Sequence, residues 1–273
     1  MSAGGTKTVS IDTLLSIMAR LRDPAGGCPW DLEQDFGSIA PYTLEEAYEV
    51  VDAIDSNDAV ALQEELGDLL FQVVFHTQLA REIGWFGFDD VVAGICDKMV
   101  RRHPHVFADA TVADATAQTR EWERHKRREK GGQQGLLTGV TPGLPALMRA
   151  DKLQRKAAGA GFDWPDIGGV FAKVEEELDE LRAELDGTSD PQALLDECGD
   201  LLFAAANLVR HAGIDPEAAL RHGNSKFVRR FEQVEALCRA AGQDVSTTDA
   251  DTLDRYWESV KAGVGPVEFP DGD

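Results

Sequence analysis

The chain carries one pattern of acidic, basic and tryptophan residues twice, and this repetition limits the folds that it can adopt. Five segments of the first half recur in the same order in the second half. They are 27–30 with 161–164, 44–49 with 175–180, 65–71 with 197–203, 98–102 with 226–230, and 122–126 with 257–261. A fixed order at nearly constant spacing indicates a tandem duplication, so we expect two modules with related folds.

A glycine-rich segment separates the two copies of the pattern. Residues 130–135 read KGGQQG, and a Thr-Pro-Gly turn signal follows at 141–143. Clusters of glycine and proline interrupt helices and favour loops. The chain length of 273 residues is also enough for about two domains. We therefore predict an N-terminal module over residues 1–135 and a C-terminal module over residues 136–273.

The apolar residues recur with the period of a helix. In the segment 11–21, apolar side chains return every three or four residues, as on an amphipathic helix. The segment 58–81 contains no proline and a single glycine, so it can form one long helix. Asp-Pro pairs at 190–191 and 215–216 are typical of an N-cap followed by the first helical residue. The sequence has no convincing alternating strand pattern, and we predict an all-α fold of duplicated helical bundle modules.

The acidic residues of each module fall on one face of a predicted helix. Residues three and four apart are neighbours on a helix, so Glu46 and Glu49 lie side by side, with Glu45 also four residues from Glu49. Glu65 and Asp68 form the same kind of pair on the next predicted helix. The second module repeats this arrangement with Glu176, Glu177, Glu180, Glu197 and Asp200.

Acidic residues on helices are usually solvated, but the surroundings of Glu65 and Asp68 favour a different interpretation. The segment 66–79 is apolar on nearly every side, which is typical of a buried helix. A buried carboxylate needs a partner, and few basic residues lie nearby in the sequence. Oxygen ligands favour a hard cation, so we predict Mg²⁺, with Mn²⁺ as the alternative. A di-iron site is disfavoured because it would need Glu-x-x-His pairs.

Basic residues follow the acidic helices at matching places in both modules. Lys98 and Arg101 in the first module correspond to Lys226 and Arg229 in the second module. Such residues could hold the phosphate oxygens of a magnesium-bound substrate, although basic residues near a helix end are also ordinary complements of the helix dipole. Trp122 and Trp257 are candidates for stacking on a base, but a lone tryptophan is more often part of the packing. The recurrence of these residues favours the functional interpretation.

The net charge of −22 excludes several classes of partner. Long nucleic acids are bound mainly through lysine and arginine, and anionic membranes would be repelled in the same way. A small anion is still compatible if divalent cations bridge it to the protein. The four cysteines lack zinc-site spacing, and no signal peptide or long apolar run is evident. We therefore expect a cytoplasmic protein.

Several longer strings make the chain recognisable. The strings EExxE at 45–49 and ExxD at 65–68 are followed by Lys98 and Arg101. They are accompanied by RLRDP at 20–24, GCPWD at 27–31, IAPYTLEE at 39–46, RRHPHVF at 101–107 and LPAL at 144–147. With these strings the chain resembles the MazG family of nucleoside triphosphate pyrophosphohydrolases along nearly its whole length.

The resemblance implies an all-α pyrophosphohydrolase fold, dependence on Mg²⁺ and a homodimer whose helices build the sites jointly. It implies the hydrolysis of nucleoside triphosphates to the monophosphate and pyrophosphate. It also implies broad base tolerance and a house-cleaning role in the nucleotide pool. In two-module members of the family, the second module is expected to be the more active one.

Matched position by position, the resemblance also assigns roles to individual residues. The catalytic metal ligands of the second module are Glu176, Glu177, Glu180, Glu197 and Asp200, one of which would position the attacking water. The parallel metal ligands of the first module are Glu45, Glu46, Glu49, Glu65 and Asp68. The substrate contacts are Lys173, Lys226, Arg229, Trp257 and Lys261, with Lys98, Arg101, Trp122 and Lys126 in the first module. Glu175 creates a run of three glutamates, which leaves the ligand register open.

Two other functions remain open on the sequence. One is a non-catalytic helical dimer that senses nucleotides or binds a regulatory partner, with magnesium in a structural role, and it would suit the first module in particular. The other is a narrower pyrophosphohydrolase, specific for dUTP, dCTP or an intermediate of the histidine pathway. The rate of turnover across a panel of substrates distinguishes both from the broad enzyme.

Overall fold

The computed structural model describes residues 9–108, 114, 135–186 and 190–263. These residues form helices and loops without any strand, which confirms the all-α fold expected from the sequence. The chain divides into two compact units, Met1–Gly132 and Gln133–Asp273, and each unit is described on its own.

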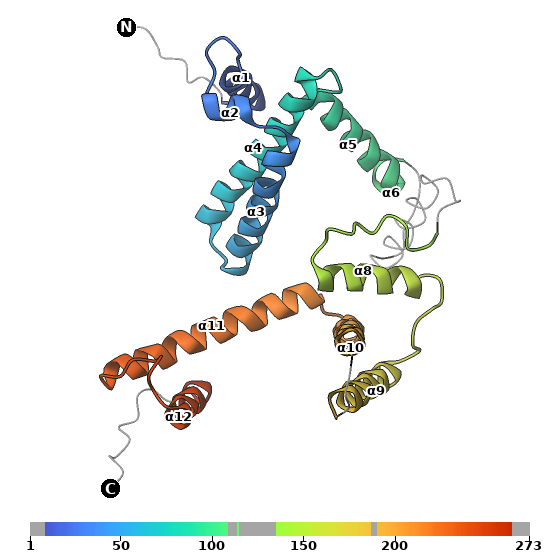
Figure 1. Ribbon diagram of the computed structural model, residues 1–273. Helices are drawn as coiled ribbons and strands as arrows, with labels where there is room; N and C mark the ends of the chain where they lie inside the picture. The colour runs from blue at the N-terminus through green and yellow to red at the C-terminus, as the bar shows by residue number, and fades with distance from the viewer. Residues whose placement is uncertain (1–8, 109–113, 115–134, 187–189, 264–273) are drawn as a thin grey trace. The chain divides into compact units, whose positions relative to one another are not determined.

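The first unit is built around a long helical hairpin. Its helices are α1 Ile11–Leu21, α2 Pro29–Glu33, α3 Phe36–Asp55, α4 Ala59–Glu82, α5 Phe88–Arg102 and α6 Pro104–Phe107. α3 and α4 lie side by side as the hairpin, and α1 packs against α4 (Figure 1). α1 and α4 confirm the helices predicted over 11–21 and 58–81.

The turn between α3 and α4 fixes how the two acidic helices face each other. Asn57 adopts a left-handed conformation with a φ of 55°, which asparagine tolerates better than most residues. The Asp58 carboxylate then accepts hydrogen bonds from the amides of Val60 and Ala61 and so caps α4. Because the connection is short, the helices run antiparallel and side chains from the middle of each can meet.

The core of the first unit lies where α1, α3 and α4 meet. Its buried residues are Met18, Ile39, Val74, Phe75 and Leu79, and Leu14, Leu15, Phe36, Phe71 and Phe88 pack around them. α4 contributes more of these side chains than any other helix, and all of those from α4 come from its second half. The acidic residues in the first half of α4 therefore lie outside the core.

Arg22 connects the segment after α1 to the end of α4. Its Nε and Nη2 donate to the carboxylate of Glu82 at 2.8 and 2.6 Å, and its Nη1 donates to the main-chain carbonyls of Asp31 and Gln34. The guanidinium also lies over the Phe75 ring, 5.5 Å from the ring centroid. The hydrogen bonds from Arg22 lower the pKa of Glu82. We call Arg22 and its partners the first clamp.

The second unit contains a matching acidic hairpin. Its helices are α8 Ala146–Ala158, α9 Ile167–Asp186, α10 Pro191–His211, α11 Pro216–Ala240 and α12 Ala250–Lys261. α9 packs against α10, α8 packs against α10 and α11, and α12 packs against α11. Asp190 and Asp215 cap α10 and α11, each followed by a proline, as predicted. Among the described helices of both units, none is long and apolar enough to cross a membrane.

In the second unit, an ion pair joins the segment before α9 to the end of α10. Arg210 Nη2 lies 2.6 Å from Asp163 Oδ1, and His211 Nε2 lies 2.9 Å from the same oxygen. Arg210 Nε donates to the buried Asn207 side chain at 2.8 Å. We call these residues the second clamp. The arginine here belongs to the helix end and the carboxylate to the leading segment, so the charges are reversed relative to the first clamp.

α4 is not buried on all sides, and the expectation drawn from its apolar composition is wrong for a single chain. Leu66, Leu70 and Val73 are 50%, 41% and 38% exposed. α3 covers one side of α4 and α1 covers its second half, so these apolar side chains stay exposed in the described part of the unit. α10 likewise exposes Leu202 and Phe203.

Candidate active site

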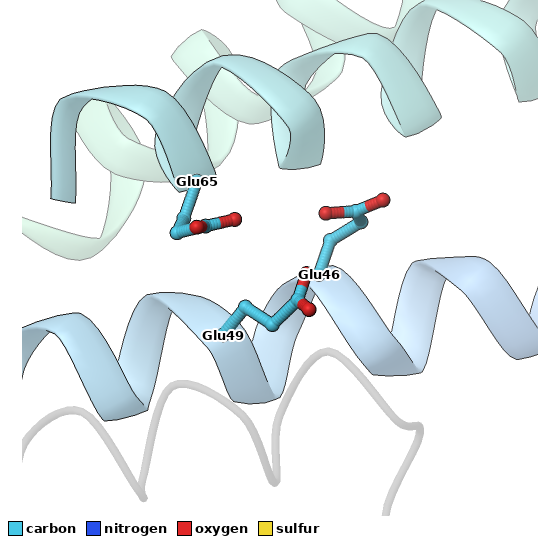
Figure 2. A group of neighbouring side chains, drawn as sticks. All are labelled: Glu46, Glu49 and Glu65. Carbon is cyan, nitrogen blue, oxygen red and sulfur yellow. The ribbon is translucent and has the colours of Figure 1, made fainter. Parts of the chain in front are cut away.

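Three carboxylates of the first unit converge between the two helices of the hairpin. Glu46 and Glu49 come from α3 and Glu65 comes from α4, and one oxygen of each lies within 4.8 Å of the others. Figure 2 shows the two glutamates on one helix and Glu65 on the facing helix. Glu46 and Glu49 share a face because they are three residues apart. We call these three residues the first carboxylate group.

The first carboxylate group concentrates negative charge. Burial raises the pKa of Glu46, and the carboxylates of Asp68 and Glu49 raise it further. Burial and the same neighbours also raise the pKa of Glu65. Gln72 Nε2 lies 3.5 Å from Glu46 Oε1, and its own Oε1 is buried without a hydrogen-bond partner among the described residues. Carboxylates this close to one another favour a bound proton or cation.

The second unit brings together Glu177 from α9 with Glu197 and Asp200 from α10, again within 4.8 Å of one another. We call these residues the second carboxylate group. Glu177 is only 4% exposed. In the described part of the chain, Oε2 of Glu177 and Oε2 of Glu197 are buried and accept no hydrogen bond. Burial raises the pKa of Glu197, and the neighbouring carboxylates raise it further. Because unsatisfied buried oxygens are costly, this arrangement fits a bound cation.

Lys173 lies beside the second carboxylate group. Its Nζ is 2.7 Å from Oε1 of Glu177 and 2.9 Å from Oε1 of Glu176. The hydrogen bonds to Glu177 and Glu176 raise the pKa of Lys173. The structure also distinguishes the three consecutive glutamates, because Glu177 belongs to the group, Glu176 pairs with Lys173, and Glu175 is exposed. Sequence analysis assigned Lys173 to the substrate, whereas the structure places it against the carboxylates.

Other predicted ligands lie close to the two groups but outside them. Asp68 is near enough to raise the pKa of Glu46, and Glu180 is near enough to raise the pKa of Glu197. Glu45 is exposed next to Glu46 on α3. The acidic pattern therefore forms an inner group of three carboxylates in each unit, with further acidic residues beside it.

Most of the predicted phosphate contacts lie on exposed helix surfaces. They are Lys98 and Arg101 on α5 and Lys226 and Arg229 on α11. Lys261, the last residue of α12, forms an ion pair of 2.7 Å with Glu258. Trp122 and Lys126 lie outside the described residues. Positive charge is thus available on helices other than those that carry the carboxylates.

Trp257 lines an apolar cavity that sequence analysis did not identify. The cavity has a volume of about 320 Å³ and is lined mainly by Phe227, Phe231, Leu253 and Trp257, with Asp254 also in its lining. The Phe227 ring is 5.4 Å from the Trp257 ring and 5.9 Å from the Phe231 ring, between centroids. The sequence signal is the spacing of Phe227 and Phe231, which places both on one face of α11.

Among the residues that the structure describes, the carboxylates and the predicted substrate contacts do not share one pocket. The second carboxylate group lies on α9 and α10, whereas the cavity at Trp257 lies between α11 and α12. Within the described residues, Lys226 and Arg229 have no ion pair with the second carboxylate group. In the described part of the second unit, the two parts of the predicted site therefore lie on different helices.

Two family models match the chain, one in each unit. The MazG nucleotide pyrophosphohydrolase domain matches residues 34–107, which contain the first carboxylate group. The phosphoribosyl-ATP pyrophosphohydrolase model matches residues 161–226, which contain the second carboxylate group. Each match therefore covers an acidic hairpin.

Relatives whose names contain nucleoside triphosphate pyrophosphohydrolase also match the chain. A protein of Escherichia coli (strain K12), named nucleoside triphosphate pyrophosphohydrolase, is 50% identical over 254 residues, or 92% of this chain and 97% of that protein. A Thermotoga maritima protein, named nucleoside triphosphate pyrophosphohydrolase/pyrophosphatase MazG, is 43% identical over 93% of this chain and 97% of that protein. A Mycolicibacterium smegmatis nucleoside triphosphate pyrophosphohydrolase is 36% identical over 60% of this chain and 51% of that protein. Because the first two similarities extend over nearly the full length of both proteins, the chain belongs to the MazG family of nucleoside triphosphate pyrophosphohydrolases.

Proposed function

We propose that this protein hydrolyses nucleoside triphosphates to the monophosphate and pyrophosphate at its carboxylate groups. The observation that carries the proposal is that Glu177 and Glu197 converge and that the Oε2 atom of each is buried without a hydrogen-bond partner among the described residues. The Escherichia coli and Thermotoga maritima relatives, which are named for this activity, support the choice of reaction.

Each carboxylate group fits Mg²⁺. The donors are oxygen atoms, which magnesium prefers, and Mn²⁺ accepts the same ligands. Burial raises the pKa of Glu46, Glu65 and Glu197, and the neighbouring carboxylates raise it further. A divalent cation would relieve the repulsion among the three carboxylates of each group, which lie within 4.8 Å of one another. When bound, the ion would stabilise charge on the phosphate oxygens and make a nearby water more acidic.

The residues around each group would position the reactants. Glu180 lies beside the second carboxylate group without belonging to it, so it is our candidate for accepting a proton from the attacking water. Lys226 and Arg229 would bind the pyrophosphate part of the substrate, and Lys261 would join them by leaving Glu258. These cations are needed because the net charge of −22 otherwise repels a triphosphate.

The cavity at Trp257 supports broad base tolerance. Its lining is mainly aromatic and aliphatic, and stacking on aromatic rings depends little on which base is bound. We therefore propose that the base rests against Phe227 and Trp257 and that several bases are accepted. An enzyme with this tolerance would suit the removal of unwanted triphosphates from the cytoplasmic nucleotide pool.

We also propose a homodimer in which a second copy completes the site. The exposed apolar residues Leu66 and Leu70 on α4 and Leu202 on α10 lie on the acidic hairpins, where a partner could cover them. Such a partner could also bring a basic helix to each carboxylate group.

The double substitution Leu70→Glu and Leu202→Glu is expected to convert the dimer to a monomer, because burying an unpaired charge in an apolar interface is costly. Sedimentation equilibrium measures the mass, and Val9→Glu, at a site 83% exposed before α1, is the control. A wild-type protein that sediments as a monomer would contradict the dimer.

The full-length protein, supplied with Mg²⁺, is expected to release pyrophosphate from a panel of ribonucleoside and deoxyribonucleoside triphosphates. EDTA should stop turnover, and excess Mg²⁺ or Mn²⁺ should restore it. Comparing orthophosphate with and without added inorganic pyrophosphatase distinguishes pyrophosphate release from direct phosphate release. Nucleotide binding without turnover would identify the non-catalytic sensor instead.

Phosphoribosyl-ATP belongs in the same panel. The second unit matches the phosphoribosyl-ATP pyrophosphohydrolase model over residues 161–226, and this match favours the narrower enzyme as a second candidate for that unit. A kcat/KM for phosphoribosyl-ATP far above that for every nucleoside triphosphate would support it. Comparable values across the panel would support the broad enzyme.

A further inference from the structure

The two carboxylate groups differ in how their negative charge is balanced. Lys173 lies four residues before Glu177 on α9, and its Nζ is 2.7 Å from Glu177 Oε1. The corresponding position in α3, four residues before Glu46, is Tyr42. Within the described part of the chain, no lysine or arginine forms an ion pair with Glu46, Glu49 or Glu65. Among the described residues, the second carboxylate group therefore has a paired lysine and the first does not.

Lys173 balances only part of the second carboxylate group. It binds Oε1 of Glu177, while Oε2 of Glu177 and Oε2 of Glu197 stay buried without a partner among the described residues. A divalent cation that binds these free oxygens would share Glu177 with the ammonium group. The two positive charges would repel each other at short range, where Coulomb interactions are strong even beside solvent.

The same ion pair has a second consequence for the metal-free protein. Glu177 is 4% exposed, and a buried carboxylate without a compensating charge destabilises the fold. Lys173 supplies that charge from within α9, so the α9–α10 hairpin can stay packed when no metal is present. The α3–α4 hairpin has Tyr42 in this place, where the ring packs edge-on against Trp30 with 6.1 Å between the ring centroids.

We propose that Lys173 is a built-in counter-cation that weakens divalent-cation binding at the second carboxylate group and stabilises this hairpin without metal. The first carboxylate group binds the same class of ion without such a competitor. Lys173 is thus a positioning residue for the metal site, and its role rests on the magnesium site of the proposed function. The second unit would release its ion more readily than the first unit when the concentration of free Mg²⁺ falls.

The test uses the full chain and Mn²⁺ alone as the probe. The double substitution Glu46→Gln and Glu49→Gln disrupts the first carboxylate group. The electron paramagnetic resonance signal of free Mn²⁺ then measures how much Mn²⁺ binds to the second carboxylate group. In this background, Lys173→Met is expected to tighten Mn²⁺ binding by about tenfold, because a unit charge beside the ion is removed. It is also expected to lower the melting temperature of the metal-free protein. Lys152→Met, at an exposed lysine on α8, is the charge-matched control.

Unchanged or weaker Mn²⁺ binding in Lys173→Met would overturn the proposal, as would an unchanged melting temperature without metal. The reciprocal variant keeps the test decisive if Lys173→Met does not fold. Tyr42→Lys, in a chain whose second group is removed by Glu177→Gln with Glu197→Gln, is expected to weaken Mn²⁺ binding at the first group by about tenfold. An unchanged affinity there contradicts the proposal equally.

These measurements distinguish a failure of the proposed magnesium site from a failure of the proposed role of Lys173. If the wild-type chain binds no Mn²⁺ and the carboxylate variants change nothing, the magnesium site of the proposed function is wrong. If both groups bind Mn²⁺ but the variants at residues 42 and 173 leave the affinities unchanged, the site stands and only the role of Lys173 is refuted.

Discussion

Replacing Glu177 with glutamine is expected to lower the rate of pyrophosphate release by roughly 10²–10³-fold, the usual cost of losing one group that stabilises the transition state. The substitution keeps the shape of the side chain but removes its charge. Glu177 is buried and lies close to Glu197 and Asp200, and its Oε2 accepts no hydrogen bond among the described residues. Its carboxylate is therefore placed to bind a cation. The kcat at saturating Mg²⁺ measures the effect, and circular dichroism verifies the helical content.

Glu175→Gln is the matched control for this variant. Glu175 lies on the same helix, two residues earlier, but it is exposed and outside the second carboxylate group. We expect it to retain the wild-type rate. If Glu175→Gln lost activity while Glu177→Gln kept it, the ligand register read from the structure would be wrong.

Replacing Arg22 with methionine is expected to destabilise the first unit by about 2–3 kcal/mol. The side chain of Arg22 is 7% exposed and holds the carboxylate of Glu82 as well as the carbonyls of Asp31 and Gln34. Methionine fills a similar volume but leaves those acceptors unpaired. The Glu82 side chain is 32% exposed, so water can solvate part of it, and the cost stays below that of a fully buried ion pair.

Hydrogen exchange of amides in α1 and α4 measures the loss of stability in Arg22→Met, because it follows the first unit separately from the second. Arg20→Met is the control, since Arg20 is exposed on α1 and such surface substitutions usually change stability by less than about 0.5 kcal/mol. Equal exchange rates in the two variants would show that the first clamp does not stabilise the unit.

The fold and the inner carboxylates could be predicted because they depend on local spacing. Glu46 and Glu49 are three residues apart, which fixes their common face as soon as the helix is assumed. The pairing with Glu65 follows from the short turn at Asn57 and Asp58, which makes the next helix return along the first. The helix caps at Asp190 and Asp215 were predictable for the same reason, because capping involves only neighbouring residues.

The contact of Lys173 with Glu177 could not be predicted in this way. A lysine four residues before a glutamate can face that glutamate or extend towards a substrate, and the sequence does not choose between them. In the structure Lys173 pairs with Glu177, whose buried carboxylate favours a nearby cation. That burial arises from the packing of α9 against α10, which involves residues distant in sequence.

The exposure of α4 was mispredicted for a related reason. An apolar sequence indicates that a surface is covered, but not whether the covering residues come from the same chain. Leu66 and Leu70 have no covering element in the described part of their unit. The cavity at Trp257 was missed because it needs Phe227 from α11 and Leu253 from α12 to meet across a loop.

The reversed charges of the two clamps bear on how a duplicated chain avoids misfolding. Related domains in one chain can exchange equivalent elements while they fold. Arg22 and Asp163 do not occupy matching positions, because Asp163 corresponds to Pro29 in the repeat. An exchange of the leading segments would therefore separate Arg22 from Glu82 and Asp163 from Arg210, and both arginine side chains are at most 10% exposed. Removing the partner of a largely buried charge is strongly destabilising, so the two different clamps disfavour the exchanged fold.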